Sequence, residues 1–246
     1  MYETFNTDAL VIGESGTGEA DSVVTLLSRT RGVITAFANG ARKPKNRLHG
    51  ATSLFCYSDF TIFEKGETLN ISGAALNTMF FKVRDSIEKL AAAEAFCELA
   101  RVLAPHNDQG AAKYLRVILN SLHYLCEDKI PPVALKCLVE LRYLTYAGFM
   151  PRLVACEECG RFESEYMYFS PHDGLIYCED HPVKGEKVPL AVIDAMRHIV
   201  FSEIKPLFAL KVPEENLKQL STLLDVYLKT VTGMRFPAVD FLATFT

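Results

Sequence analysis

The sequence lacks several features that define large classes of protein. It has no tryptophan, no apolar run long enough to cross a bilayer, and no excess of positive charge, since its 246 residues carry a net charge of −4. The first residues, MYETFNTDALVIG, have neither the positively charged start nor the long apolar stretch of a signal peptide. A membrane span and a uniformly basic nucleic-acid binder are therefore excluded, and we expect a cytoplasmic protein.

Motifs of catalysis are also missing. The chain contains no phosphate-binding GxxxxGK[S/T] loop, no GxSxG nucleophile turn and no HExxH metal motif. The glycines between Gly13 and Gly18 do not have the spacing of a dinucleotide-binding fingerprint. We therefore predict a protein without enzymatic activity.

The first 80 residues favour β structure. Short runs rich in Val, Thr, Ile and aromatic residues follow one another at close spacing, with a glycine-rich turn expected at Gly13–Gly18 and a break near Ser58 and Asp59. The expected strands are Asp8–Ile12, Ser22–Leu27, Val33–Phe37, Leu54–Phe63 and Thr68–Ser72. Five such strands predict a small barrel such as the OB-fold. An SH3-like barrel or a small open sheet fits the pattern nearly as well.

The rest of the chain has the apolar periodicity of helices. The helical faces are expected at 90–103, 115–126, 134–144, 189–202 and 214–231, with Leu90 assigned to the first apolar face. An irregular segment, 150–188, interrupts them. The prediction is an α+β chain with an OB-fold domain at 1–80 and a helical domain at 81–246 that contains this segment.

The irregular segment carries four residues with the spacing of a zinc site. Residues 156–181 read CEECGRFESEYMYFSPHDGLIYCEDH, in which 18 residues separate two pairs of ligands. The expected ligands are Cys156, Cys159, Cys178 and His181. Zinc prefers thiolate and imidazole donors in a tetrahedron, and four donors close its coordination shell. We therefore predict one structural Zn²⁺ per chain.

Two features bear on how this site is built. Gly160 follows the first cysteine pair, where the backbone often needs a positive φ, and the second pair is expected to approach from a neighbouring hairpin. His172 and Asp180 lie close by in the sequence, so each is an alternative to His181 as the fourth ligand. The remaining four cysteines, which lie in apolar stretches, are expected to be small buried side chains.

A second candidate site is a basic loop between two strands, GARKPKNRLHG at residues 40–50. No acidic residue occurs between Asp21 and Asp59. The loop supplies Arg42, Lys43, Lys45 and Arg47. Cations beside a small barrel suit phosphate binding, so these four are predicted to bind DNA. Because tryptophan is absent, bases would stack on phenylalanine or tyrosine, for which the candidates are Phe37, Phe55 and Tyr57.

From about residue 5 to 235 the chain resembles the RecO family of bacterial DNA repair proteins. The resemblance is carried by Glu19–Ser22, the GARKPKNR loop, Ala147–Pro151 and Gly174–Cys178. It implies an OB-fold followed by a helical domain, binding of single- and double-stranded DNA, and annealing of complementary strands. It also implies partnership with RecR and with the C-terminal tail of single-stranded DNA-binding protein, which together help to load RecA. His181 stands where many members have a fourth cysteine.

Two other functions fit some of the same features. The chain could be a zinc-ribbon module that binds only protein, with the basic loop recognising an acidic tail. It could also be an RNA-modifying enzyme with a barrel and a structural zinc. Residues 150–187 contain eight acidic and four basic residues, which suits a protein partner better than DNA. For this reason the helical domain is expected to bind the protein partners.

Overall fold

The five N-terminal strands form a closed barrel. The computed structural model describes residues 3–106, 108–181 and 185–245. The barrel strands are β1 (Thr4–Thr17), β2 (Asp21–Ser28), β3 (Gly32–Ala38), β4 (Cys56–Lys65) and β5 (Thr68–Met79). Their order is β1-β2-β3-β5-β4, with β1 also paired to β4; only β3 and β5 are parallel. This topology is that of the OB-fold, so that prediction is confirmed and the open sheet is excluded.

Three details of the barrel differ from the expectation. The Gly13–Gly18 stretch is mostly strand, because β1 runs on to Thr17 and Gly13 only shifts its register against β2. Strand β4 is continuous through Ser58 and Asp59, with a register shift where a break was predicted. Strand β5 extends to Met79, since it pairs with the start of β4. In each case a partner strand stabilises backbone that local sequence does not favour.

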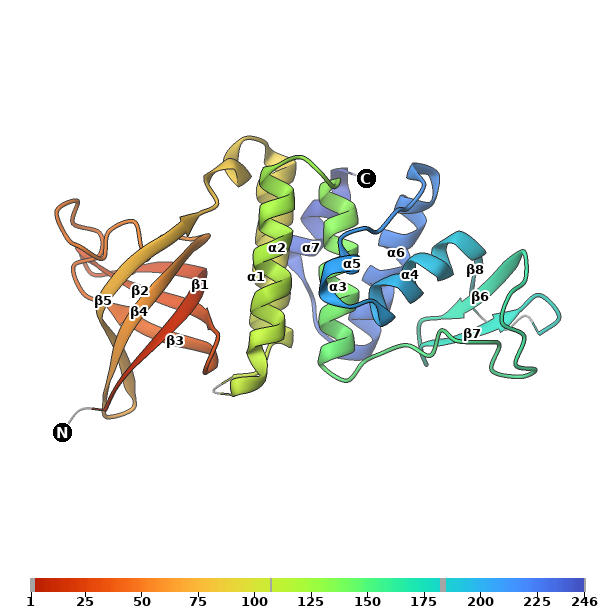
Figure 1. The fold of residues 1–246 in the computed structure, drawn as a ribbon, viewed down its shortest axis with the longest axis horizontal. Helices are drawn as coiled ribbons and strands as arrows, with labels where there is room; N and C mark the ends of the chain where they lie inside the picture. The colour runs from red at the N-terminus through yellow and green to blue at the C-terminus, as the bar shows by residue number, and fades with distance from the viewer. Residues whose placement is uncertain (1–2, 107, 182–184, 246) are drawn as a thin grey trace.

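Seven helices and a small sheet follow the barrel in the described part of the chain (Figure 1). The helices are α1 (Ile87–Leu103), α2 (Ala112–Cys126), α3 (Pro132–Tyr146), α4 (Leu190–Phe201), α5 (Ile204–Leu207), α6 (Glu214–Thr232) and α7 (Pro237–Leu242), with short 3₁₀ turns η1 (Phe81–Arg84), η2 (Gln109–Ala111) and η3 (Ala243–Phe245). The five predicted helices are confirmed. Leu90, which was expected on the buried face of the first helix, is exposed instead. The buried face of α1 consists mainly of its alanines, Phe96 and Leu99.

The segment expected to be irregular contains a three-stranded antiparallel sheet. Its strands are β6 (Tyr166–Ser170), β7 (Leu175–Cys178) and β8 (Glu186–Pro189), in the order β7-β6-β8. Met167, Phe169 and Ile176 bury one face of this sheet in the helical core. Strands this short give a weak periodic signal, and their core face is visible only once the helices are in place.

The barrel and the small sheet lie at opposite ends of the molecule, with the helices between them (Figure 1). The junction with the barrel is close: the Val33 N–H donates to the Pro105 carbonyl at 2.9 Å. A Cβ at Gly32 would lie 2.1 Å from that carbonyl oxygen, so only glycine fits there. The helical core also includes Leu10, Ile12 and Leu27 of the barrel. None of the described helices is long and apolar enough to span a bilayer.

Candidate functional site

The four predicted metal ligands come together at one point. The ligand atoms of Cys156, Cys159, Cys178 and His181 all lie within 4.8 Å of one another. The Sγ atoms of Cys159 and Cys178 are 3.7 Å apart, and Cys178 Sγ lies 3.4 Å from His181 Nδ1. A tetrahedron with Zn–S bonds of about 2.3 Å has edges of roughly 3.8 Å. The group can therefore hold a metal ion, and its dimensions and donors fit zinc.

Two backbone turns hold these ligands in place. In the first turn the Gly160 N–H donates to the Cys156 carbonyl at 2.9 Å, and Gly160 has the positive φ, 72°, that the sequence suggested. The second turn starts where β7 ends, with the His181 N–H on the Cys178 carbonyl at 3.0 Å. A hydrogen bond of 3.0 Å from Glu157 N–H to the Ile176 carbonyl joins the two turns. The arrangement is therefore fixed by main-chain contacts from both sides.

The surroundings also distinguish between the alternative ligands. Asp180 is engaged elsewhere, because its Oδ2 forms an ion pair of 2.5 Å with Arg161 Nη2. His172 is exposed and lies outside the ligand group, whereas His181 is a member of it. Burial raises the pKa of the Cys156 thiol, but N–H donors of Cys159, Cys178 and Glu158 outweigh it and lower this pKa to about 6. A thiolate is the form that binds metal.

The four cations of the basic loop are all exposed. Within the described residues, none of them forms an ion pair with a carboxylate. The Arg42 guanidinium instead lies over the β1–β2 turn, where it donates to the Gly18 carbonyl at 3.4 Å. An unpaired cluster of this kind repels itself and favours an anionic partner.

Buried side chains and hydrogen bonds fix the conformation of the loop that carries these cations. Ala41 and Leu48 are buried in the barrel core, so the loop is pinned at two points while its charged side chains point away. Asn46 bridges the loop through its side chain, donating to the Asn39 carbonyl at 3.1 Å and accepting from the Leu48 N–H at 2.9 Å. His49 Nδ1 lies 2.9 Å from the Ala41 carbonyl oxygen. A loop held in this way loses less entropy when a ligand binds.

Comparison with known proteins decides the family. A family model described as Recombination protein O N terminal matches residues 1–80, and one described as Recombination protein O C terminal matches residues 84–239. The chain belongs to the RecO family. The DNA repair protein RecO of Myxococcus xanthus is 33% identical over 246 residues, 98% of both chains. That of Acetivibrio thermocellus is 30% identical over 241 residues, 97% of this chain and 96% of the relative.

Two other arginines of this RecO-family barrel are neutralised. Arg29 forms an ion pair of 2.6 Å with Asp8, and Arg31 pairs with Glu64. Burial opposes ionisation of Asp8, but hydrogen bonds from Arg29 and Tyr57 outweigh it and hold the Asp8 pKa below its usual range. Apart from the exposed Lys65, the unpaired positive charge among the described barrel residues therefore lies on the basic loop, whose four cations the sequence analysis had selected.

Of the three proposed stacking residues only Phe37 is exposed to a useful extent, at 37%. Phe55 is buried, and the Tyr57 hydroxyl is held by Asp8 and Arg29. Phe55 precedes β4 and packs into the core that the barrel shares with the helices, a contact that strand alternation does not predict. Phe37 remains as the candidate on the outer face.

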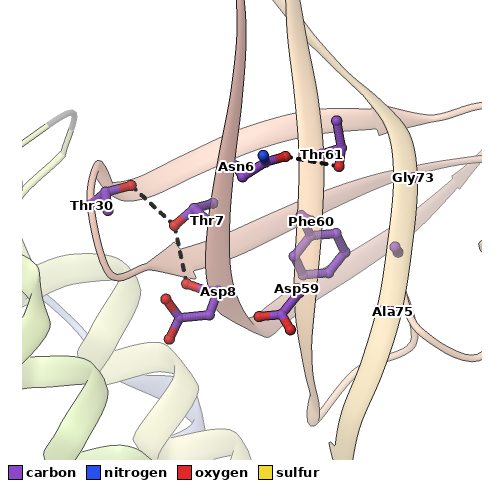
Figure 2. A pocket seen from close by; sticks show the side chains of 10 residues that line it. Asn6, Thr7, Asp8, Thr30, Asp59, Phe60, Thr61, Gly73 and Ala75 are labelled. Carbon is purple, nitrogen blue, oxygen red and sulfur yellow. Dashed lines mark hydrogen bonds between the residues drawn. The ribbon is translucent and has the colours of Figure 1, made fainter.

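A cavity of about 590 Å³ lies on another side of the barrel, between β1, β4 and β5. Figure 2 shows Asp8 and Asp59 at its rim, with a hydrogen bond between Asn6 and Thr61 above them. None of the basic-loop cations lines it. Its lining residues include two aspartates and no lysine or arginine, so this cavity is separate from the predicted DNA surface of the chain.

Arg197 is a positioning residue that the sequence reading missed. It lies in the apolar helix α4, and its guanidinium donates to the carbonyls of Leu153 at 2.7 Å, Val154 at 3.0 Å and Phe162 at 2.8 Å. These carbonyls flank the first ligand turn, so Arg197 attaches the metal-binding segment to the helices. The signal in the sequence is a single arginine within an apolar helical face, where a charge requires buried partners.

Proposed function

We propose that this RecO-family chain binds single- and double-stranded DNA through its barrel and anneals complementary strands. The observation that supports this most is the basic loop: Arg42, Lys43, Lys45 and Arg47 are exposed, unpaired within the described chain and fixed on an OB-fold. Phosphate contacts of this kind bind any sequence. The outward Phe37 would add stacking with unpaired bases.

The proposal includes the protein partners that the family resemblance implies. With RecR, the chain would help to load RecA onto DNA coated by single-stranded DNA-binding protein, whose C-terminal tail it would bind. We assign DNA binding to residues 1–80 and partner binding to the helical part, residues 81–246, which contains the acidic segment 150–188. The protein would act without catalytic turnover, in the cytoplasm and on the nucleoid.

The metal in this proposal is one structural zinc ion held by Cys156, Cys159, Cys178 and His181. Its role would be to fix the segment 150–188 against the helices, together with Arg197. The donor set supports this role, because four protein ligands leave no open position for a substrate.

Competition binding separates this function from that of a protein-only module. Labelled single-stranded DNA is bound to the full chain, and unlabelled DNA or an acidic peptide is then added. Displacement by DNA at far lower concentration than by the peptide supports the proposal. Strong displacement by the peptide, with DNA binding that does not respond to salt, would support a module that binds only protein.

A further inference from the structure

The turn between the barrel and the first helix exposes an aromatic ring. After β5 ends, Phe80 is buried against the core, and the chain passes through η1 into α1 (Figure 1). Val83 is buried as well, whereas Phe81 between them is 63% exposed. Neither the barrel nor the helices use this ring for packing, and large exposed apolar side chains are common at binding surfaces.

A cation lies beside this ring and contacts the end of the β3–β4 connection. Arg84 Nη2 donates to the Leu54 carbonyl at 3.3 Å, and the guanidinium carbon lies 6.0 Å from the centre of the Phe81 ring. Within the described ranges no carboxylate lies at ion-pair distance from Arg84. The neighbouring Lys82 is different, because Glu127 lies 3.7 Å from its ammonium group.

The backbone at this point is fixed in an unusual conformation. Phe55, although not a glycine, has a φ of 68°, in a region that costs a bulky residue free energy. The Phe55 N–H donates to the Val11 carbonyl at 3.1 Å, and the Phe55 carbonyl accepts from the Phe80 N–H at 3.3 Å. The guanidinium carbon of Arg84 lies 5.5 Å from the centre of the Phe55 ring. These contacts hold the Leu54 carbonyl, and therefore Arg84, in one position next to Phe81.

The balance of charge identifies the class of ligand. Leu54 and the basic loop, residues 40–50, belong to the same connection between β3 and β4. The exposed cations of the loop lie in the first part of this connection, and Arg84 contacts its end at Leu54. The nearby acid Glu14 accepts a hydrogen bond of 3.3 Å from the Leu54 N–H. A guanidinium that has no carboxylate at ion-pair distance and lies beside an exposed ring matches a polyanion that carries aromatic bases.

We infer that Phe81 and Arg84 form a second contact for a single DNA strand that leaves the basic loop, with Phe81 stacking on an unpaired base and Arg84 binding a phosphate. The inference rests on the proposed DNA binding and adds to it a preference for single strands. Bases in a duplex are stacked on one another and do not present a free face to Phe81. The basic loop, in contrast, contacts phosphates that both kinds of DNA have.

The absence of tryptophan from the chain allows a direct test. Phe81→Trp introduces a single indole, whose fluorescence falls when a base stacks on it. Phe201→Trp is the matched control, because Phe201 is also an exposed phenylalanine, at 56%, but lies on α4. Titration with an oligothymidine should quench Phe81→Trp and leave Phe201→Trp unchanged.

Affinity measurements complete the experiment. Phe81→Ala should weaken binding of the oligothymidine by at least about 5-fold, the lower end for loss of one stacked base, with duplex affinity and salt dependence unchanged. Arg84→Ala should reduce the slope of log affinity against log salt by about 0.7, the share of one phosphate. Phe201→Ala should have no effect.

The outcomes separate the inference from the function on which it rests. A folded Phe81→Ala variant with full affinity, together with an unquenched Phe81→Trp, would overturn the inference while DNA binding by the wild type stands. Loss of binding to RecR in Phe81→Ala, with DNA affinity intact, would also overturn it and make this surface a protein contact. Failure of the wild type to bind DNA would remove the proposed function and the inference together.

Discussion

The basic loop, residues 40–50, and the Cys/His segment, residues 150–188, are both long connections, but they use charge in opposite ways. The four cations of the loop have no carboxylate partner in the described chain, and the loop is held by Ala41, Leu48 and Asn46 instead. In the Cys/His segment Arg152 and Arg161 each pair with a neighbouring acid, and acidic residues outnumber basic ones by eight to four over residues 150–187. Unpaired charge of one sign is available to a ligand, whereas paired charge stabilises its own segment.

The two connections also lie at opposite ends of the molecule (Figure 1). The loop belongs to the barrel, and the segment is attached to the helices through Arg197. Changes in one region should therefore leave the other region unaffected, as expected for sites that share no partners. The predictions below test this independence.

Loss of a metal ligand should have the largest effect. We expect Cys156→Ser to lower the zinc content from about one per chain to near zero and to destabilise the protein by several kcal/mol, since structural zinc sites bind with about 10 kcal/mol or more. Elemental analysis and urea unfolding measure the two quantities. DNA affinity at low temperature, where the variant remains folded, should stay close to that of the wild type.

Cys126→Ser is the matched control for this variant, because Cys126 is a half-buried cysteine outside the ligand group. It should keep its zinc. A Cys156→Ser variant that unfolds at the same urea concentration as the wild type would show that the group does not stabilise the segment.

Removal of the basic loop's charge should have the next largest effect. If each cation neutralises one phosphate, the loop contributes about −0.7 × 4, or roughly −3, to the single-strand salt slope. A fourfold rise in salt would then weaken binding about 50-fold through this loop. The Ala variant of Arg42, Lys43, Lys45 and Arg47 should lose most of this dependence, and strand annealing should fall in parallel, with zinc content unchanged.

A second quadruple variant controls for the change in net charge. It replaces four exposed cations of the helical part with Ala, namely Lys129, Lys205, Lys211 and Arg235. This variant should bind DNA with the salt slope of the wild type. If both variants behave alike, overall charge and not the loop determines DNA affinity.

We expect the stability of the protein to depend on pH through a buried charge cluster where α3 contacts α6, in the helical part that separates the two regions. Lys136 is fully buried with two carboxylates: its ammonium group lies 3.0 Å from Glu140 Oε2 and is hydrogen-bonded to Asp225. Burial, although opposed by Lys136, raises the pKa of Glu140 to about 8.

The sign of the effect follows from proton linkage. Between the ordinary glutamic acid pKa of 4.5 and about 8, the folded protein holds a proton that the unfolded chain releases. The free energy of unfolding should therefore fall as pH rises through this window. Urea midpoints measured from pH 5 to pH 9 should show this fall in the wild type and a smaller one in Glu140→Gln. An equal slope in both proteins would assign the dependence to other groups.

The smallest expected effect is that of the loop variant on protein partners. The quadruple Ala variant of the basic loop should retain RecR and the tail of single-stranded DNA-binding protein as well as the wild type does, because we assign those contacts to residues 81–246. Pull-down with the full chain is the measurement. Parallel loss of DNA and partner binding would show that the barrel carries both functions.

The sequence by itself determined the features that depend on local spacing. The ligand pairs Cys156/Cys159 and Cys178/His181 each lie within one turn of chain, so their spacing fixes much of their geometry. The cations between Arg42 and Arg47 are adjacent and flanked by turn residues, so their exposure also follows from the sequence. The strand and helix periods predicted the order of the five barrel strands and the five longer helices for the same reason.

Only the tertiary structure decided the features that depend on distant partners. Asp8 and Glu64 neutralise Arg29 and Arg31 from other strands, which removes two cations from the unpaired positive surface of the barrel. Arg197 reaches carbonyls more than 30 residues away in the sequence. Phe55 is buried, and Phe81 exposed, by the way β4 and β5 meet η1. Local patterns give which side chains are charged or aromatic, whereas folding determines which of them remain free to bind.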